Sequence, residues 1–268
     1  MLLDRAGASP GVIDGFDGDN VRKAVFAFQL MTGLPADGTV TPAVIGLLES
    51  PDPVVGGYVI TAEDIAAVVA PLPSDYAELA LREFLGYTSV AELLAERFHM
   101  DVDFLLALNP GAQFVAGETI FAAVYGPNRE GAVTRIEADK RLRQVRAYDA
   151  EGTLLAAYPA TIGSADNPSP SGTYEVEVAA AMPTYTYNPK INFQQGENTE
   201  VLTIPPGPNG PVGSMWIALS KPTYGIHGTP EPSLIDKTGS HGCVRLTNWD
   251  AEELAAMVSP GVTVEFLS

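Results

Sequence analysis

The sequence predicts a multidomain α+β protein, with a small N-terminal helical bundle, an α/β middle module and a β-rich, sandwich-like C-terminal domain. Its 268 residues exceed the roughly 100–200 that one domain usually needs. Apolar residues recur at helical spacing near the N-terminus, whereas after residue 129 apolar and polar residues alternate as in strands. A hydrophobic fraction of 46% and a charged fraction of 18% are typical of a globular chain with a buried core.

The helical bundle is predicted over residues 1–50. The segment DNVRKAVFAFQLMTG places apolar residues from Val21 to Phe28 on one face, with Asp19 as the candidate cap and Gly33 as the end of the helix. A second helix is predicted to start at Thr41, because a hydroxyl residue followed by proline is a common helix beginning. Helices this short and this close must pack on each other to be stable.

A proline- and glycine-rich linker, SPDPVVGG, precedes the middle module, which we expect to span residues 56–127. Its first strand is expected at residues 58–61. A capping box from Ser89 to Glu92 then predicts one helix, VAELLAERFHM, and a second short helix, VDFLLALNPG, follows. The segment ETIFAAV predicts the closing strand.

The C-terminal domain is predicted to span residues 129–268. Stretches such as TRIEADKRLRQVRAY and GTYEVEVAA indicate antiparallel strands separated by turn residues. Residues 182–214 are rich in Pro, Gly and Asn, and we expect them to form a long surface loop, which at this length is usually either functional or disordered. A strand at 215–220, a helix that starts at a capping box of Thr247 and Asp250, and a last strand, VTVEFLS, complete the domain.

Charge and composition narrow the function. The net charge is −18 and both halves of the chain are acidic, so nucleic acid is not expected as a partner. No apolar run reaches the roughly 18 residues of a transmembrane helix. The start, MLLDRAG, lacks the features of a signal peptide, so the protein is either cytosolic or has lost its signal. A single cysteine excludes an internal disulfide and a zinc site built on several thiolates.

That cysteine lies in IHGTPEPSLIDKTGSHGCVRL, together with two of the three histidines of the chain. A thiol becomes a strong nucleophile only as thiolate, and a neighbouring histidine can take its proton. His241 lies two residues before Cys243 and would share its face in an extended segment. His227 lies sixteen residues earlier, at the end of a predicted strand, and the intervening loop could bring it back beside the thiol.

The flanking residues add further parts of an acyl-transfer site. Gly242 permits close approach of a substrate, and the amides of Gly242 and Cys243 could stabilise an oxyanion. Arg245, two residues beyond the thiol, could hold a carboxylate. Taken singly, each residue also fits an ordinary structural role: a buried cysteine, a loop histidine, a surface arginine. Their concentration within nineteen residues favours acyl transfer.

The pattern IHGT followed by SHGCVRL, with SPSGTYEV and NPKINF upstream, resembles the L,D-transpeptidases, whose catalytic domain is of the YkuD type. The similarity covers about residues 130–268. Residues 2–48 resemble the peptidoglycan-binding type 1 domain, a three-helix module. The middle module resembles a degenerate LysM module, which binds the glycan of peptidoglycan, with an insertion at residues 62–87.

The resemblance implies roles for individual residues. Cys243 would be the nucleophile and His227 its proton acceptor, oriented by a backbone carbonyl. The loop that shapes the site and its oxyanion donors would comprise Ser240, His241 and Gly242. Arg245 and Tyr224 would contact the substrate, and the loop PTYTYNPKINF would form part of a wall or lid.

The reaction that the resemblance implies has two steps. The thiolate attacks the carbonyl of the L-centre of a diamino acid in a tetrapeptide stem, releasing D-alanine and leaving a thioester. Carbapenems would acylate the same thiol. An amine of a second stem, or a lysine of a wall-anchored protein, then accepts the acyl group. No metal or organic cofactor is needed, and the substrate implies an exported, periplasmic or wall-associated protein. A hydrolase of the same fold, acting as carboxypeptidase or amidase, and a non-catalytic wall-binding protein are the alternatives.

Overall fold

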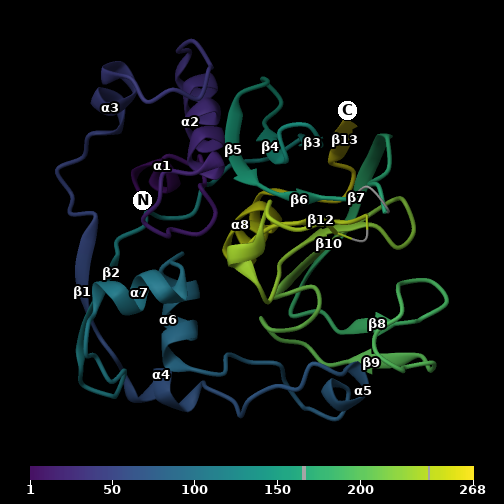
Figure 1. The fold of residues 1–268 in the computed structure, drawn as a ribbon. Coiled ribbons are helices and arrows are strands. Elements are labelled where there is room, and N and C mark those ends of the chain that lie inside the picture. The colour runs from purple at the N-terminus through teal and green to yellow at the C-terminus, as the bar shows by residue number, and fades with distance from the viewer. Residues whose placement is uncertain (165–166, 241) are drawn as a thin grey trace.

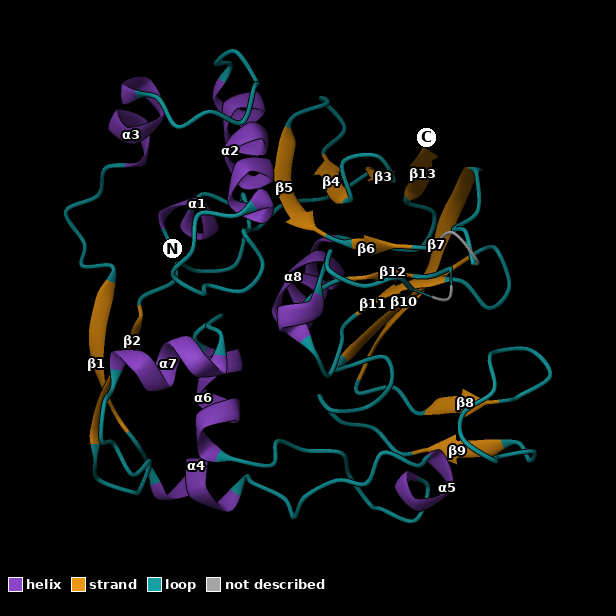
Figure 2. Cartoon of the chain, in the orientation of Figure 1, coloured by secondary structure: helices purple, strands orange, loops and turns teal. Residues whose placement is uncertain are grey.

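The computed structural model describes residues 1–164, 167–240 and 242–268. Figure 1 shows three groups of elements: helices near the N-terminus, a middle group on the same side of the molecule, and a large sheet at the C-terminus. Figure 2 shows that an extended stretch runs from the middle group to a short helix beneath the large sheet. Among the helices of the described residues, none is both long and apolar enough to cross a membrane.

The N-terminal group comprises α1 (Leu2–Arg5), α2 (Asp19–Thr32) and α3 (Pro42–Leu48). The prediction of Asp19 as the cap of α2 was wrong, because Gly18 holds the extended cap position and Asp19 is the first helical residue, paired with Arg22 at 3.6 Å. Gly33 ends the helix in the left-handed conformation, as predicted. Thr41 caps α3 by accepting from the backbone NH of Val44 at 3.3 Å, also as predicted.

The middle group has the predicted order of strand, helices and strand. It comprises β1 (Val55–Val59), α4 (Ala62–Ala66), α5 (Tyr76–Leu79), α6 (Val90–Arg97), α7 (Val102–Leu108) and β2 (Thr119–Ala123). The first strand lies earlier than the expected residues 58–61 and pairs antiparallel with β2. Ser89 caps α6, but Glu92 bonds the NH of Thr88 instead of completing the predicted capping box. Residues 62–87 contain the two additional short helices α4 and α5.

The C-terminal sheet has nine strands in the order β5-β4-β3-β13-β7-β10-β11-β12-β6. Its strands are β3 (Arg135–Asp139), β4 (Gln144–Tyr148), β5 (Leu154–Pro159), β6 (Thr161–Ile162), β7 (Gly172–Ala181), β10 (Met215–Leu219), β11 (Gly225–His227), β12 (Val244–Arg245) and β13 (Thr263–Leu267). β5 and β6 are consecutive in the chain yet lie at opposite ends of this order, so the sheet curls back on itself. Helix α8 (Asn248–Met257) packs on it and contributes Leu254 to the main core.

Two features of this domain differ from the prediction of antiparallel strands and a long loop. β13 pairs parallel with β3, and β11 pairs parallel with β12, because long connections replace tight hairpins at these places. The expected loop at 182–214 contains an antiparallel pair, β8 (Tyr185–Tyr187) and β9 (Leu202–Ile204). Tyr187 and Ile204 are fully buried against Leu79 and Leu85 of the middle group, so a tertiary contact orders this segment.

Candidate active site

Three neighbouring strands, β10, β11 and β12, present two different faces. On one face Ile217, Ile226 and Val244 are in register and fully buried in the core. Because side chains alternate along a strand, the next residue of each strand points the other way. There Trp216 lies opposite His227, and His227 lies opposite Arg245. Cys243, two residues before Arg245, extends this second face. The fold therefore brings a thiol, an imidazole and a guanidinium to one surface of the sheet.

His227 is held tightly at the end of β11. Its Nδ1 lies 2.7 Å from the carbonyl oxygen of Gly228, so Nδ1 carries the proton that it donates and Nε2 keeps its lone pair. The imidazole stacks on the indole of Trp216 at 5.5 Å between ring centroids. Burial, together with the charge of Arg245, lowers the pKa of His227 to about 4, although the bond to Gly228 opposes the shift. The ring is therefore neutral at physiological pH, and its orientation by a backbone carbonyl agrees with the expectation from sequence.

The surroundings of Cys243 favour the neutral thiol. Burial raises the pKa of its thiol, while a backbone bond from Gly225 and the charge of Arg245 act in the opposite direction. Sγ donates to the carbonyl oxygen of Thr223 at 3.7 Å, rather than to His227. Thr223 has φ = 71°, which is rare for a β-branched residue, so the turn between β10 and β11 is strained where it meets the thiol.

Two serines hold the loop that presents the thiol. Ser240 is buried, donates to the carbonyl of Cys243 at 2.6 Å and accepts from the NH of Gly163 at 2.8 Å. Ser169 donates to the carbonyl of Gly242 at 2.7 Å. These bonds fix the direction of both peptide units beside the thiol. Ser169 stands in the segment SPSGTYEV, which carried part of the family resemblance, but its contact with this loop was not predicted.

Gly242 and Tyr224 are in contact. Gly242 has φ = 103°, and a Cβ at this position would lie 3.0 Å from Cε1 of Tyr224, so only glycine fits without strain. Tyr224 therefore lies beside the loop of the thiol, and its expected contact with the substrate stays a prediction. Burial lowers the pKa of Arg245, while Glu231, Cys243 and Tyr76 oppose this shift. The predicted site residue His241 lies outside the described residues.

Comparison with known proteins agrees with this geometry. Residues 133–266 match the YkuD family, described as the L,D-transpeptidase catalytic domain. The chain belongs to the YkuD family of L,D-transpeptidase domains. Residues 1–48 match a second family, described as a putative peptidoglycan-binding domain, which confirms the expected nature of the N-terminal unit. The LysM resemblance of the middle group stays a prediction.

Proteins named as L,D-transpeptidases are similar to this chain over much of their length. A putative L,D-transpeptidase YkuD from Bacillus licheniformis is 32% identical over 176 residues, which cover 65% of this chain and 90% of the relative. A probable L,D-transpeptidase YbiS from Escherichia coli is 31% identical over 227 residues, which cover 79% of this chain and 71% of the relative. A crystal structure of an Enterococcus faecium L,D-transpeptidase mutant aligns with 22% identity and a TM-score of 0.38, covering 51% of this chain and 50% of that one.

A buried amide that sequence reasoning missed anchors the catalytic strands of this YkuD domain. Oδ1 of Asn248 accepts from the NH groups of Ser214 and Thr229, both at 3.0 Å, so it fixes the backbone directly before β10 and directly after Gly228, whose carbonyl holds His227. Nδ2 of Asn248 donates to the carboxyl of Glu96 at 2.9 Å. Because Glu96 lies on α6, the middle group contributes to the framework behind the site. Asn248 looked like an ordinary residue of a helix start, so no sequence signal distinguished it.

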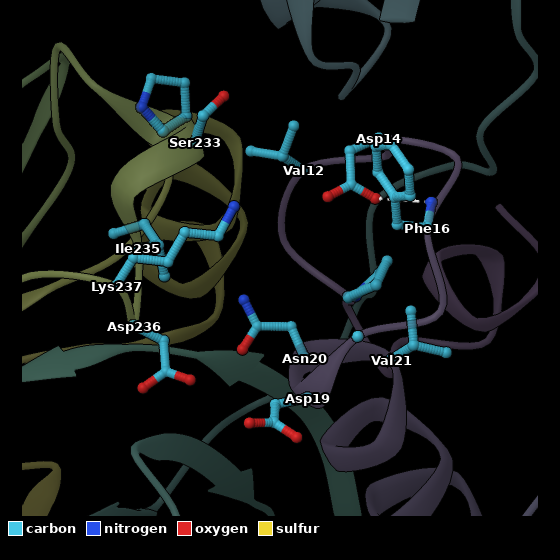
Figure 3. Close-up of a pocket in the computed structure, with 13 residues that line it drawn as sticks. Val12, Asp14, Phe16, Asp19, Asn20, Val21, Ser233, Ile235, Asp236 and Lys237 are labelled. Atoms are coloured by element: carbon cyan, nitrogen blue, oxygen red, sulfur yellow. Dashed lines mark hydrogen bonds between the residues drawn. The ribbon is translucent and has the colours of Figure 1, made fainter.

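A cavity of about 230 Å³ is lined by the N-terminal unit and by the connection from β11 to β12. Figure 3 shows it between the segment that leads into α2 and the connection from β11 to β12. Asn20 and Lys237 point toward its centre, with Asp14 and Phe16 on the far side. None of the described residues that we expected to act in catalysis lines this cavity.

Proposed function

We propose that the protein is an L,D-transpeptidase that acts on peptidoglycan stem peptides, with Cys243 as the nucleophile and His227 as the general base. One arrangement carries this proposal. His227 ends β11, Cys243 directly precedes the parallel neighbour β12, and the Nδ1 bond to Gly228 leaves Nε2 of His227 as the proton acceptor. Membership of the YkuD family supports the assignment.

The ground state of the site is a neutral thiol with a neutral imidazole. As Sγ attacks the carbonyl of the donor diamino acid, its proton passes to Nε2 of His227, and the carbonyl oxygen becomes an oxyanion. When the tetrahedral intermediate collapses, the imidazolium gives this proton to the leaving nitrogen of D-alanine. A thioester on Cys243 remains. An incoming amine attacks it, His227 takes up the amine's proton, and the thiol is restored.

The surrounding residues have distinct parts in this scheme. The amides of Gly242 and Cys243 stabilise the oxyanion, in a loop held by Ser240 and shaped together with His241. Arg245 attracts a carboxylate of the substrate and Tyr224 lines the pocket. The acceptor is a primary amine of a second stem or of a wall-anchored protein, and water in its place would give a carboxypeptidase.

The other two units bring this chemistry to its substrate. The domain at residues 1–50 binds peptidoglycan, the LysM-like module at 56–127 contacts glycan, and the domain at 129–268 performs the transfer. Such a substrate places the protein in the periplasm or at the wall. The match of residues 1–48 to a putative peptidoglycan-binding domain supports this arrangement.

Intact-protein mass spectrometry tests the proposal. With a carbapenem or a tetrapeptide donor, the wild-type chain should gain the mass of one acyl group. Cys243→Ala should gain none, and His227→Gln should acylate roughly 10²–10⁴-fold more slowly, because it lacks a general base. An adduct that persists in Cys243→Ala would contradict the nucleophile. Free stems without new cross-links would favour the hydrolase, and wall binding without any adduct would favour the non-catalytic alternative.

A further inference from the structure

Two segments far apart in the sequence form one layer next to the catalytic strands. We call it the composite roof: residues 72–85 of the middle group together with the β8–β9 pair. Figure 1 shows α5 beside β9, beneath β8. Tyr76 of α5 lies at the centre, with its ring edge-on to Tyr187 at 5.2 Å, to Phe193 at 6.1 Å and to Tyr185 at 6.3 Å. The middle group therefore supplies an aromatic side chain to a structure that otherwise belongs to the catalytic domain.

Hydrogen bonds fix the two halves of the composite roof in register. Gln195 accepts from the backbone NH of Tyr76 at 3.1 Å and donates to the carbonyl of Ser74 at 2.8 Å. Asn198 donates to the carboxylate of Asp75 at 3.1 Å. Further along, Leu85 donates its NH to the carbonyl of Pro206 at 2.8 Å. This contact is built from specific polar bonds on both sides, so α5 has a defined position relative to the hairpin.

The composite roof adjoins the face that carries the thiol. The chain enters β8 from the end of β7, where Met182 donates its NH to the carbonyl of Ser214, directly before the strand that carries Trp216. The electrostatics agree with this placement. Burial raises the pKa of Tyr185, and Cys243 adds to the shift. Burial also raises the pKa of Tyr76 to about 12, and Arg245 opposes that shift.

The hydroxyl of Tyr76 has no protein partner among the residues that the structure describes, although its ring is half-buried. It remains protonated at neutral pH and can donate a hydrogen bond. A phenol donor near a guanidinium, in a partly buried setting, suits an anion rather than a neutral group, because both donors gain strength from a charged acceptor.

We propose that Tyr76, supplied by the middle group, donates its hydroxyl together with Arg245 to the terminal carboxylate of the donor stem peptide. This inference rests on the proposed transpeptidase function. It makes Tyr76 a specificity-determining residue outside the catalytic domain, so the site is complete only when the middle group is docked. The ligand class is a peptide with a free C-terminal carboxylate.

Steady-state kinetics of Tyr76→Phe test this with two donors, a tetrapeptide with a free terminal carboxylate and the same peptide as its C-terminal amide. The ring and its packing remain in this variant, so thermal unfolding should match that of the wild type. KM for the acid should rise about tenfold, the size expected for a bond to a charged group, with kcat little changed. KM for the amide should not change. Tyr174→Phe, whose hydroxyl bonds Ser171 at 3.1 Å on another part of the sheet, is the matched control.

The outcomes separate the possible failures. An unchanged KM for the acid in Tyr76→Phe would overturn the inference. An equal rise in KM for acid and amide would show that Tyr76 shapes the composite roof without binding the carboxylate. That result would also overturn the inference. Absence of any acyl adduct in the wild type by intact mass, with either donor, would instead contradict the proposed function.

Discussion

Two segments outside the catalytic sheet dock on it in different ways. The N-terminal unit covers the outermost strand, β5: Ser9 donates its NH to the carbonyl of Ala157 at 2.9 Å, and Phe28 packs in a cluster with Leu154. The segment 72–85 instead packs on the β8–β9 hairpin, next to the thiol face. Both contacts bury apolar side chains, yet the first closes an exposed edge and the second borders the site.

The difference shows that burial alone does not identify a functional contact. Covering an edge strand satisfies its free backbone groups and prevents association with other chains, so β5 needs a cover whatever the protein does. A hairpin that borders the thiol of Cys243 has no such general need. The hydrogen bonds of Gln195 and Asn198 to residues 74–76 therefore indicate that the position of this hairpin matters for the site. The N-terminal unit does reach the β11–β12 connection, where Lys23 pairs with Asp236.

The largest effect is expected from Phe28→Ala. Phe28 is 5% exposed, and its loss should lower the free energy of unfolding by about 3–5 kcal/mol, because a cavity opens beneath α2. Urea unfolding measures this. If covering the edge is purely structural, KM for the donor peptide should remain at the wild-type value in the folded protein. A changed KM would show that this contact reaches the site, through Lys23.

Leu85→Ala perturbs the other contact and is the matched comparison. Leu85 is fully buried against the hairpin, and its truncation should reduce the free energy of unfolding by about 2–5 kcal/mol. Here KM for the donor should also rise, since the composite roof loosens. Urea unfolding and steady-state kinetics on the same preparation test this. Lost stability with an unchanged KM would show that the contact of residues 72–85 is as purely structural as the contact of the N-terminal unit with β5.

A smaller, pH-dependent effect is expected at Glu96. Burial raises its pKa to about 8, against an unfolded value near 4.5, and the bond from Asn248 only partly offsets this. The folded state therefore holds a proton that the unfolded state loses, so the contribution of Glu96 to stability is fully present below pH 4.5 and is lost as pH rises through 8. Glu96→Gln should remove this slope and be more stable than the wild type at pH 8. Parallel slopes in thermal unfolding from pH 5 to 8 would contradict the role of Glu96.

The parts of the fold that follow from local patterns could be predicted. Gly33 and Thr41 end and start helices through their own backbone and hydroxyl chemistry, and the family motif around Cys243 is contiguous. The sequence also placed His227 at a strand end, where the structure has it. Gly18 and Asp19 could not be distinguished as caps, because both are accepted there and the choice depends on one residue's dihedral angles.

Contacts between distant segments could not be predicted. The hairpin at 182–214 reads as a loop, because the apolar residues that bury Tyr187 lie more than a hundred positions earlier. The Asn248 anchor joins α8 to two loops and to Glu96, and a single asparagine gives no periodicity to detect. The thiol contact with Thr223 depends on a strained turn that no propensity favours.

The composite roof also bears on how the chain can be divided. A catalytic domain separated at residue 129 would leave Tyr187 and Ile204, now fully buried, facing water without Leu79 and Leu85. The boundary predicted at residue 129 therefore does not separate two independent hydrophobic cores. Residues 72–85 should exchange their amide hydrogens in step with the hairpin rather than with β1 and β2. An exchange of middle modules between relatives would thus also transfer part of the proposed selectivity for the donor peptide.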